Sequence, residues 1–295
     1  MLLGTFQVFG EGCFTVSLFF WLFAFFGAVF IVFVVSLSWL IASAAVFGGL
    51  IVLRHFQVKG IRYLSASNWL SRPDPNAPGP DLSKVPAVYF LYVMGSGGHS
   101  AEMIETVKQK FRGYKNQHRR YVVTSGDKSS QDMILRLEAQ IADAYPNGGA
   151  GTFDVFAVKR ARAVHQSLLT SPYTCLIAAM HAANALTRAP NERPARRFGT
   201  EFKYPHVIVT NGPATGFIIG LVAHVLKVFF FAPQNRLKTV YIESWARTET
   251  LSLTGKLFLW TGIANVFGVQ HQDLARAIPG AEYVGQVTGR LTPVG

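Results

Sequence analysis

Hydrophobic residues dominate the first part of the chain. From Gly12 to Leu53 the sequence contains no Asp, Glu, Lys, Arg or His. A membrane-crossing helix needs about 20 predominantly apolar residues, so this run is long enough for one crossing or for two. We therefore predict a short N-terminal tail over residues 1–13 and a transmembrane anchor over residues 14–53.

The anchor run has a stronger and a weaker half. Phe14–Val35 is the stronger span, whereas Leu37–Leu53 is shorter and carries Ser38 and Ser43. The weaker half is a second span, a re-entrant segment or an interfacial helix. Basic residues follow the run directly, and only Glu11 and the terminal amine precede it. Because Lys and Arg beside a span favour the cytosolic side, we expect the rest of the chain to face the cytosol.

Residues 54–84 are predicted to form a linker. The first part of this segment is basic, and the second part, within SRPDPNAPGPDLSKVP, is rich in proline. Proline fixes φ and lacks an N–H donor, so prolines this dense exclude a helix or a central strand. We expect a stiff, extended connection.

Beyond the linker, short apolar runs alternate with longer segments of helical periodicity. Strands separated by whole helices indicate βαβ units and a mostly parallel, doubly wound sheet. About 215 residues follow residue 80, enough for one such domain, so residues 85–295 are predicted to form a single Rossmann-like α/β domain. The predicted strands are Val88–Met94, Tyr121–Thr124, Phe153–Val158, Val207–Thr210, Thr239–Ile242 and Val266–Val269. The predicted helices are Ala101–Arg112, Ser129–Ala144, Val164–Leu186, Gly216–Phe231 and Leu251–Thr261.

Two segments need a separate interpretation. Arg188–Pro205 is rich in charge and proline and is predicted to be a surface loop. The apolar segment Ile218–Phe231 is predicted to be a buried crossover helix. Its closing sequence VFFFAP alternatively dips into the bilayer.

A glycine-rich loop, Gly95–His99, follows the first predicted strand and precedes a helix that opens at Ser100. Glycines let the backbone approach a ligand closely, and the first N–H groups of a helix point at whatever lies there. Such a turn favours a phosphate or a diphosphate. His99 lies at the helix start, where it is a candidate general base or a hydrogen-bond donor to phosphate. The alternative is an ordinary tight turn.

The other predicted strands end in similar loops. Each is rich in Gly, small hydroxyls or basic groups, and the carboxyl ends of parallel strands meet at one edge of the sheet. One shared anion site explains this concurrence, although NGPATG is also a good helix start, with Asn211 as N-cap and Pro213 in the first turn. The loops are Ser125–Ser130, Lys159–Ser167, Asn211–Gly216 and Glu243–Thr250.

Charge and composition narrow the possible partners. The net charge is +12, and basic residues cluster behind the anchor and between Arg188 and Lys203. A membrane surface and phosphate-bearing substrates account for this charge, whereas no aromatic–basic stacking motif or DNA-binding signature points to nucleic acid. The two cysteines provide no disulfide framework, and no His/Asp/Glu spacing indicates a metal site. We expect neither a metal nor a cofactor.

Four segments in this order behind an N-terminal anchor resemble one family: GSGGHSAEM, TNGPATG, VYIESWARTETLSLTGKLFLW and EYVGQV. The family is the membrane-anchoring subunit of the endoplasmic-reticulum UDP-N-acetylglucosamine transferase, the fourteenth member of the asparagine-linked glycosylation series. The resemblance covers Val88 to about Val287. It implies the N-terminal lobe of a two-lobed GT-B glycosyltransferase.

The resemblance also implies a heteromeric enzyme of the endoplasmic-reticulum membrane that works on the cytosolic face. This subunit recruits a soluble, catalytic subunit that binds UDP-GlcNAc, and the pair adds the second GlcNAc to GlcNAc-diphospho-dolichol in lipid-linked oligosaccharide synthesis for protein N-glycosylation. The chain is then an inactive half of an inverting N-acetylglucosaminyltransferase when alone. Chain length agrees, because a two-lobed transferase needs two doubly wound domains.

The resemblance assigns roles to several residues. His99 is the only base that we name for catalysis, and the C-terminal stretch Glu282–Val287 is where partner contact is expected. The residues implied in acceptor-diphosphate binding are Gly95, Ser96, Gly97, Gly98 and Ser100. The residues implied in lining the cleft are Asn211, Gly212, Thr215, Glu243 and Arg247. Ala214, where relatives often carry Gly, and the tail beyond Val287 depart from the family pattern.

Two alternative functions remain open. A membrane-anchored oxidoreductase with a nicotinamide site requires an acidic residue after the second strand, and Asp127 is roughly in that place. However, Lys128 and the absence of a third glycine weaken this interpretation. The second alternative is a scaffold that recruits a partner and touches no substrate.

Overall fold

The structure of the chain is a computed structural model that describes residues 6–69, 87–161, 171–192, 202–212 and 214–285. The chain divides into two compact units, Met1–Phe56 and Gln57–Gly295. The first unit is formed by most of one long helix, and the second contains the α/β domain.

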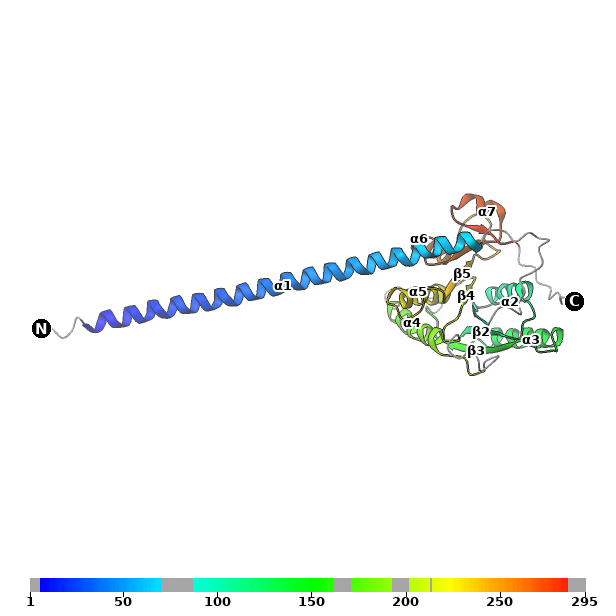
Figure 1. Cartoon of the computed structure of the whole chain (residues 1–295), viewed down its shortest axis with the longest axis horizontal. Coiled ribbons are helices and arrows are strands. Elements are labelled where there is room, and N and C mark those ends of the chain that lie inside the picture. Colours follow the sequence, from blue (N-terminus) through cyan, green and yellow to red (C-terminus); the bar gives the residue numbers. More distant parts are fainter. Residues whose placement is uncertain (1–5, 70–86, 162–170, 193–201, 213, 286–295) are drawn as a thin grey trace. The chain divides into compact units, whose positions relative to one another are not determined.

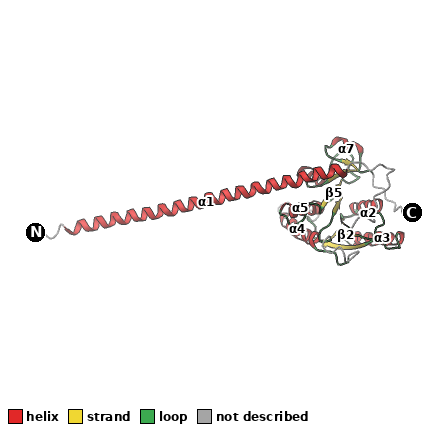
Figure 2. Ribbon diagram, in the orientation of Figure 1, coloured by secondary structure: helices red, strands yellow, loops and turns green. Residues whose placement is uncertain are grey.

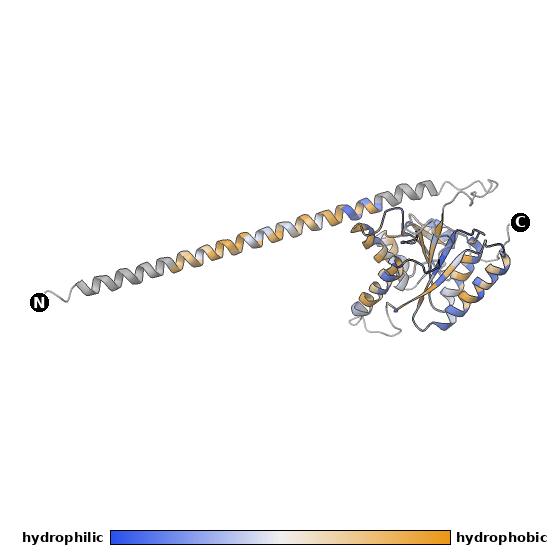
Figure 3. Ribbon diagram, turned by 60° about the horizontal axis from the view of Figure 1, so that its bottom comes forward, coloured by the Kyte–Doolittle hydropathy of each residue, from blue (hydrophilic) through white to orange (hydrophobic). Residues whose placement is uncertain are grey.

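The N-terminal helix α1 runs without interruption from Phe6 to Trp69 (Figure 1). Its apolar stretch Leu22–Lys59 is long and apolar enough to cross a membrane, and at 1.5 Å per residue it spans about 57 Å, against about 30 Å for a hydrocarbon core. No turn divides the described helix, so the structure has one continuous element where the sequence left two spans open. Hydrophobic residues cover most of this stretch (Figure 3).

The first, basic part of the predicted linker is helical. Helix α1 continues through the basic residues Arg54 and Lys59 to Trp69. These residues are compatible with a helix, and only the proline-rich part of the sequence forbids one. That part, residues 70–84, lies outside the described residues.

The α/β domain is built on a seven-stranded, fully parallel sheet with strand order β3-β2-β1-β4-β5-β6-β7. Figure 2 shows the strands with helices around them. This confirms the predicted doubly wound parallel α/β domain. The strands are β1 (Val88–Val93), β2 (Gln117–Thr124), β3 (Thr152–Val158), β4 (Val207–Thr210), β5 (Lys238–Ile242), β6 (Val266–Val269) and β7 (Glu282–Tyr283).

The helices form two layers because the strand order reverses at β1. The chain moves outward from β1 to β3 and then returns to β4 in the middle of the sheet. Right-handed crossovers in opposite directions place α2 and α3 on one face and α4, α5 and α6 on the other, as Figure 1 shows for the α2–α3 and α4–α5 pairs. The helices are α2 (Gly98–Lys110), α3 (Lys128–Ala144), α4 (Ser171–Thr187), α5 (Ala214–Val228), α6 (Leu253–Thr261) and α7 (Gln272–Ala277).

Each face of the sheet has its own apolar core. Met103, Ile134 and Leu137 pack beneath α2 and α3, and Ala182 and Ile219 pack beneath α4 and α5. A third cluster, around Tyr241 and Phe258, lies under α6. These contacts fix the positions of the strand ends from which the site is built.

Strand β2 begins four residues before its predicted start at Tyr121, because two buried arginines are part of it. Arg119 donates to both carboxylate oxygens of Glu138, at 2.8 and 2.6 Å, and Arg120 donates to Asp154 at 2.9 and 2.6 Å. Both guanidinium groups are almost fully buried, which requires such pairing. Burial by itself raises the pKa of Asp154, but the hydrogen bonds from Arg120 and the nearby His118, whose Nε2 lies 3.5 Å from Oδ1, hold that pKa at about 2.

Part of the predicted surface loop Arg188–Pro205 is buried. Phe202 is fully buried and clusters with Ala87 and Tyr89. The ring of His206 accepts a hydrogen bond from the backbone N–H of Tyr89 at 3.0 Å, through Nδ1. Residues 193–201 lie outside the described residues, so the prediction stays untested there.

The C-terminal part contains elements that the sequence did not predict. Helix α7 follows β6 along the chain. The two-residue strand β7, Glu282–Tyr283, then pairs with β6 and extends the sheet at that edge. Residues 286–295 lie outside the described part of the chain, as do residues 162–170 of the helix predicted over Val164–Leu186. Helix α4 confirms the remainder of that helix.

Candidate functional site

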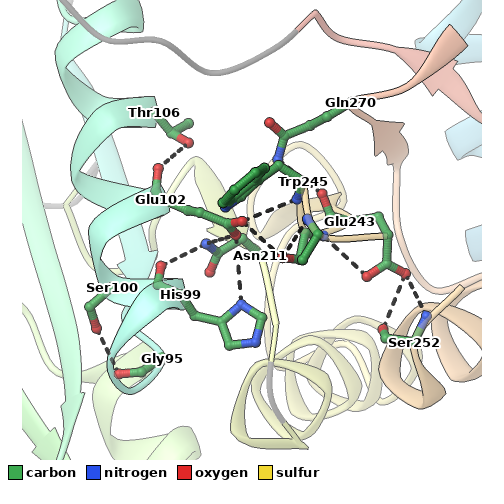
Figure 4. A network of polar contacts seen from close by, with 12 residues as sticks. Gly95, His99, Ser100, Glu102, Thr106, Asn211, Glu243, Trp245, Ser252 and Gln270 are labelled. Atoms are coloured by element: carbon green, nitrogen blue, oxygen red, sulfur yellow. Dashed lines mark hydrogen bonds and ion pairs between the residues drawn. The ribbon is translucent and has the colours of Figure 1, made fainter. Parts of the chain in front are cut away.

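The loops that follow β1, β4 and β5 meet at the carboxyl edge of the sheet, where the strand order reverses (Figure 4). Ligands of open α/β sheets bind at such a switch point, because the loops on the two sides diverge from it. The site is built from the glycine loop Gly95–His99, the first turn of α2, Asn211, and the segment Glu243–Trp245.

The glycine loop presents open backbone. Gly95 is buried, but Ser96, Gly97 and Gly98 are exposed. Gly97 has φ 59° and ψ −119°, a conformation that side-chain-bearing residues rarely adopt. A Cβ at Gly98 would meet nothing within 4 Å. As the first residues of α2, Gly98 and His99 have N–H groups without an intrahelical partner, so the loop can receive an anion.

Ser100 holds the glycine loop in place. Its side chain is fully buried, its Oγ donates to the carbonyl of Gly95 at 2.8 Å, and it lies 2.7 Å from Oγ of Ser130. Ser130 in turn binds the carboxylate of Asp127. The hydroxyl of Ser100 therefore supports the loop from behind, and its backbone N–H donates to the carbonyl of Gly97 at 3.1 Å.

Asp127 is the N-cap of α3. Its carboxylate accepts hydrogen bonds from the backbone N–H of Ser130 at 3.1 Å and from its hydroxyl at 2.8 Å. The nicotinamide alternative required this carboxylate for a ribose. The capping role already uses it, which argues against that alternative.

Glu102 is the centre of the site, although the sequence did not single it out. Its Oε1 accepts from Ser244 Oγ at 2.8 Å and from the backbone N–H of Trp245 at 3.1 Å. Its Oε2 accepts from Nδ2 of Asn211 at 3.2 Å. One buried carboxylate thereby joins the loops after β1, β4 and β5 (Figure 4).

His99 lies at the open side of this network. Its side chain is 38% exposed, and Nδ1 lies 3.7 Å from Oε2 of Glu102. A Cβ at Gly212 would lie 2.8 Å from the same nitrogen, so the ring rests against bare backbone. Within the described part of the chain, His99 Nδ1 has no hydrogen-bond partner. The position of the imidazole is therefore fixed by packing, while its Nδ1 makes no hydrogen bond to the described residues.

Asn211 links the glycine loop to the second half of the sheet. It donates from Nδ2 to the carbonyl of His99 at 2.7 Å, in addition to its bond to Glu102. Its Oδ1 is buried and has no hydrogen-bond partner among the described residues. A buried amide oxygen without a partner is costly in the folded protein, which is expected at a site that a ligand completes.

Glu243 stabilises the loop after β5 from within. It is 1% exposed, and its carboxylate accepts from the backbone N–H groups of Ser244 and Ser252 and from the Ser252 hydroxyl. Ser252 caps α6, and Gln270 donates to the Glu243 carbonyl at 3.1 Å. Glu243, which the sequence predicts to line the cleft, is thus buried and holds the loop after β5 through these hydrogen bonds.

The remaining predicted site residues have different exposures. Thr215 and Gly212 are buried near the start of α5, whereas Arg247 is exposed beyond Trp245. Trp245 is itself 61% exposed. The described residues contain no group of three His, Cys, Asp or Glu side chains that could hold a metal ion.

The sequence does not single out Glu102 or Gln270, and it includes Ser244 and Trp245 only as part of the loop Glu243–Thr250. Glu102 follows His99 by three residues, which places both on one side of a helix, and this was the available signal. The other contacts join residues far apart in the sequence. Chemically, the site offers a backbone cradle for an anion beside an imidazole that can exchange a proton.

Comparison with known proteins places this chain among glycosylation proteins. Residues 90–287 match the model of the family described as "Oligosaccharide biosynthesis protein Alg14 like". The chain is 34% identical over 210 residues to the UDP-N-acetylglucosamine transferase subunit alg14 of Aspergillus fumigatus, covering 57% of this chain and 91% of that protein. It is 32% identical to the subunit of the same name from Schizosaccharomyces pombe, covering 68% and 83%, and 26% identical to that of Homo sapiens, covering 70% and 86%.

A solved structure is also similar. The crystal structure of Acinetobacter baumannii MurG matches with a TM-score of 0.41 and 15% sequence identity, covering 68% of this chain and 44% of that one.

Proposed function

The chain belongs to the Alg14-like family of oligosaccharide biosynthesis proteins, and from this premise we propose that it is the acceptor-binding subunit of a heteromeric UDP-N-acetylglucosamine transferase. The observation that carries the proposal is the exposed glycine loop at the start of α2, beside an imidazole whose Nδ1 lies 3.7 Å from the Glu102 carboxylate. The acceptor is a lipid-linked GlcNAc diphosphate, and its diphosphate binds the N–H groups of Gly98 and His99.

The donor sugar comes from a partner. A two-lobed transferase needs two doubly wound domains, and the described residues contain one seven-stranded sheet. A soluble subunit therefore binds UDP-GlcNAc, and the cleft between the two subunits is the complete active site. The C-terminal segment from Glu282, which begins as edge strand β7, is the proposed partner contact.

Helix α1 anchors the assembly. Its stretch Leu22–Lys59 suits a membrane span, and the basic residues at its end favour the cytosolic side for the domain. We place the complex on the cytosolic face of the endoplasmic reticulum, where the anchor recruits the soluble subunit to a membrane-bound acceptor.

The reaction is one inverting displacement. A hydroxyl oxygen of the acceptor GlcNAc forms a bond to the anomeric carbon of the donor, the bond from that carbon to the UDP oxygen breaks, and UDP leaves with the electron pair. His99 takes the hydroxyl proton, and the carboxylate of Glu102, at 3.7 Å, stabilises the resulting imidazolium. Charge on the acceptor diphosphate is neutralised by the helix N-terminus.

Reconstitution tests this proposal. The full chain, the UDP-GlcNAc-binding subunit and the pair are each supplied with UDP-GlcNAc and a GlcNAc-diphospho-lipid, and transfer is measured. We expect activity from the pair only, and a His99→Ala pair slower by roughly 10²- to 10⁴-fold at saturating acceptor. Transfer by either subunit alone would contradict the division of labour. Near-normal turnover of the His99→Ala pair would remove His99 from the chemistry.

A further inference from the structure

The helix layer formed by α4, α5 and α6 is apolar on its outer side. Helix α4 packs three alanines and Leu186 inward, whereas three of its large side chains point out. The inward alanines are Ala178, Ala182 and Ala185, and Tyr173, Leu176 and Met180 are 70%, 61% and 58% exposed. Their spacing of three and four residues places them on one face of the helix. This is the reverse of the usual amphipathic helix, in which the large apolar residues are buried.

Helix α5 continues this surface. Leu221 and Val225 are exposed and are followed at the same spacing by Phe229. Helices α4 and α5 are neighbours in one layer, so their outward sides belong to the same face of the domain. Helix α6, which contacts α5, adds Leu253 and Trp260, which are 69% and 70% exposed.

The turn after α5 exposes two aromatic rings, and one of the two residues has a strained backbone conformation. Phe230 has a φ of 62° and is 74% exposed, and Phe231 is 68% exposed. The left-handed conformation suits glycine and is rare for a bulky residue. An apolar phase around this turn would cover both exposed rings.

The charges around this surface also point to a membrane. Neither α4 nor α5 contains an Asp or a Glu. The exposed Lys203 lies over the ring of Tyr204, with Nζ 5.3 Å from its centroid, and the Tyr204 hydroxyl donates to the carbonyl of Phe231 at 2.6 Å. A basic residue thus lies beside the aromatic turn, an arrangement that suits an anionic headgroup layer.

The opposite face of the domain provides the contrast. The outer positions of α3 include Lys128, Asp132, Arg136 and Asp143, and among them Leu135 is the large apolar side chain that is exposed, at 55%. Both helix layers are subject to the same packing requirement against the sheet. The apolar outer surface of the α4–α6 layer is therefore not a general property of the domain.

We propose that the outer surface of α4, α5 and α6, with the turn Phe229–Phe231, lies flat on the lipid bilayer as a second membrane contact besides α1. The length and composition of α1 bring the domain to a bilayer, which makes lipid the partner within reach. The contact runs along the helices, from Tyr173 near the carboxyl edge of the sheet to Phe231 near the other edge. It therefore brings the site edge close to the headgroups, where a lipid-linked diphosphate presents itself.

The proposal is tested with the full chain in vesicles. An environment-sensitive fluorophore is attached in a Cys13→Ser, Cys175→Ser background, either at Phe231→Cys or at Leu135→Cys as the matched control on the other face. Vesicles of phosphatidylcholine, with and without phosphatidylserine, carry spin-labelled lipids that quench fluorescence in the bilayer. We expect several-fold stronger quenching at position 231 than at position 135, and stronger quenching with phosphatidylserine.

A second variant tests the same contact through function. Phe230→Gly suits the backbone conformation and removes the ring, so the thermal midpoint is expected to stay the same or rise. In the reconstituted pair, its KM for a long-chain lipid acceptor is expected to rise several-fold, while its KM for a short-chain, water-soluble acceptor is unchanged. The quenching measurement needs no substrate, so its outcome is independent of the proposed transferase function.

Three results would overturn the proposal. The first is equal quenching at positions 231 and 135. The second is protection of the label at position 231 by the soluble partner subunit in the absence of vesicles, which would make this surface a protein interface. The third is a Phe230→Gly pair whose KM for the long-chain acceptor equals that of the unsubstituted pair.

Discussion

At the scale of single residues, Glu102 determines how the site is assembled. Its two oxygens accept hydrogen bonds from the loops after β4 and β5, and it lies beside His99. A carboxylate is required because every partner in this network is a donor. Glutamine has the same shape but presents one donor group, which would face the amide N–H of Asn211 or the backbone N–H of Trp245.

We therefore predict that Glu102→Gln lowers kcat of the reconstituted pair by roughly 10- to 100-fold and the free energy of unfolding by about 1–3 kcal/mol. KM for UDP-GlcNAc is expected to stay constant because the partner binds the donor. Glu105→Gln is the matched control: this residue lies one turn along α2 and, among the described residues, pairs with Lys108 at 3.2 Å and not with the site. Equal activity of the two variants would show that Glu102 does not position the site.

At the scale of elements, His206 joins the segment before β4 to β1. Its Nδ1 accepts from the Tyr89 N–H, which requires the neutral ring. Burial, followed by the positive charges of Arg236 and Lys238, lowers the His206 pKa to about 4. Because the unfolded chain takes up this proton near pH 6.5, the stability contribution is present above that pH and is lost as the pH falls towards 4.

The variant His206→Asn tests this linkage. Asparagine accepts the same hydrogen bond through its side-chain oxygen and does not titrate. We expect the free energy of unfolding of the variant to fall less steeply between pH 6.5 and pH 4 than that of the natural chain. Denaturant unfolding of both chains at several pH values measures the two slopes, and identical slopes would rule out His206 as the titrating group.

The elements also show where sequence reasoning succeeds. Strands β1, β4 and β6 are continuous apolar runs, as expected for a buried parallel sheet, and their positions are predicted almost residue by residue. The first half of β2 is not predicted, because Arg119 and Arg120 are residue types that usually lie in solvent. Their burial depends on ion pairs with Glu138 and Asp154, which the sequence alone does not show. Strand β7 is too short to give a periodic signal.

The site follows the same division. The glycine loop and NGPATG can be proposed from sequence because glycine at a strand-to-helix turn is visible in one short segment. Glu102 was missed because its partners Asn211 and Ser244 lie 109 and 142 residues further along the chain. Glu243 was assigned to the cleft from its loop, but its burial depends on Ser252 and on the close approach of Gly255.

At the scale of the whole molecule, the chain combines a long apolar helix with one α/β domain. The two units suit a division of labour in which α1 anchors the chain in the membrane and the domain forms half of an active site. The central claim is that the glycine loop at the start of α2 holds an acceptor diphosphate. The proposed binding of the lipid-linked acceptor depends on that assignment.

Gly98 allows the sharpest test of that claim, because its conformation and surroundings accept a side chain without strain. An Asp at the first position of a helix is favourable for folding, but its charge repels a diphosphate at the same N–H groups. Gly98→Ala adds bulk without charge and is the matched control. The measurement is KM for the GlcNAc-diphospho-lipid in the reconstituted pair, with KM for UDP-GlcNAc as internal reference.

The account predicts that Gly98→Asp raises the acceptor KM by roughly 30-fold or more, equivalent to about 2 kcal/mol of charge repulsion. Gly98→Ala should change the acceptor KM much less. Neither variant should change KM for UDP-GlcNAc, and neither should lower the thermal midpoint. If the acceptor KM of the Gly98→Asp pair equals that of the Gly98→Ala pair, no diphosphate lies at this loop and the central claim is wrong.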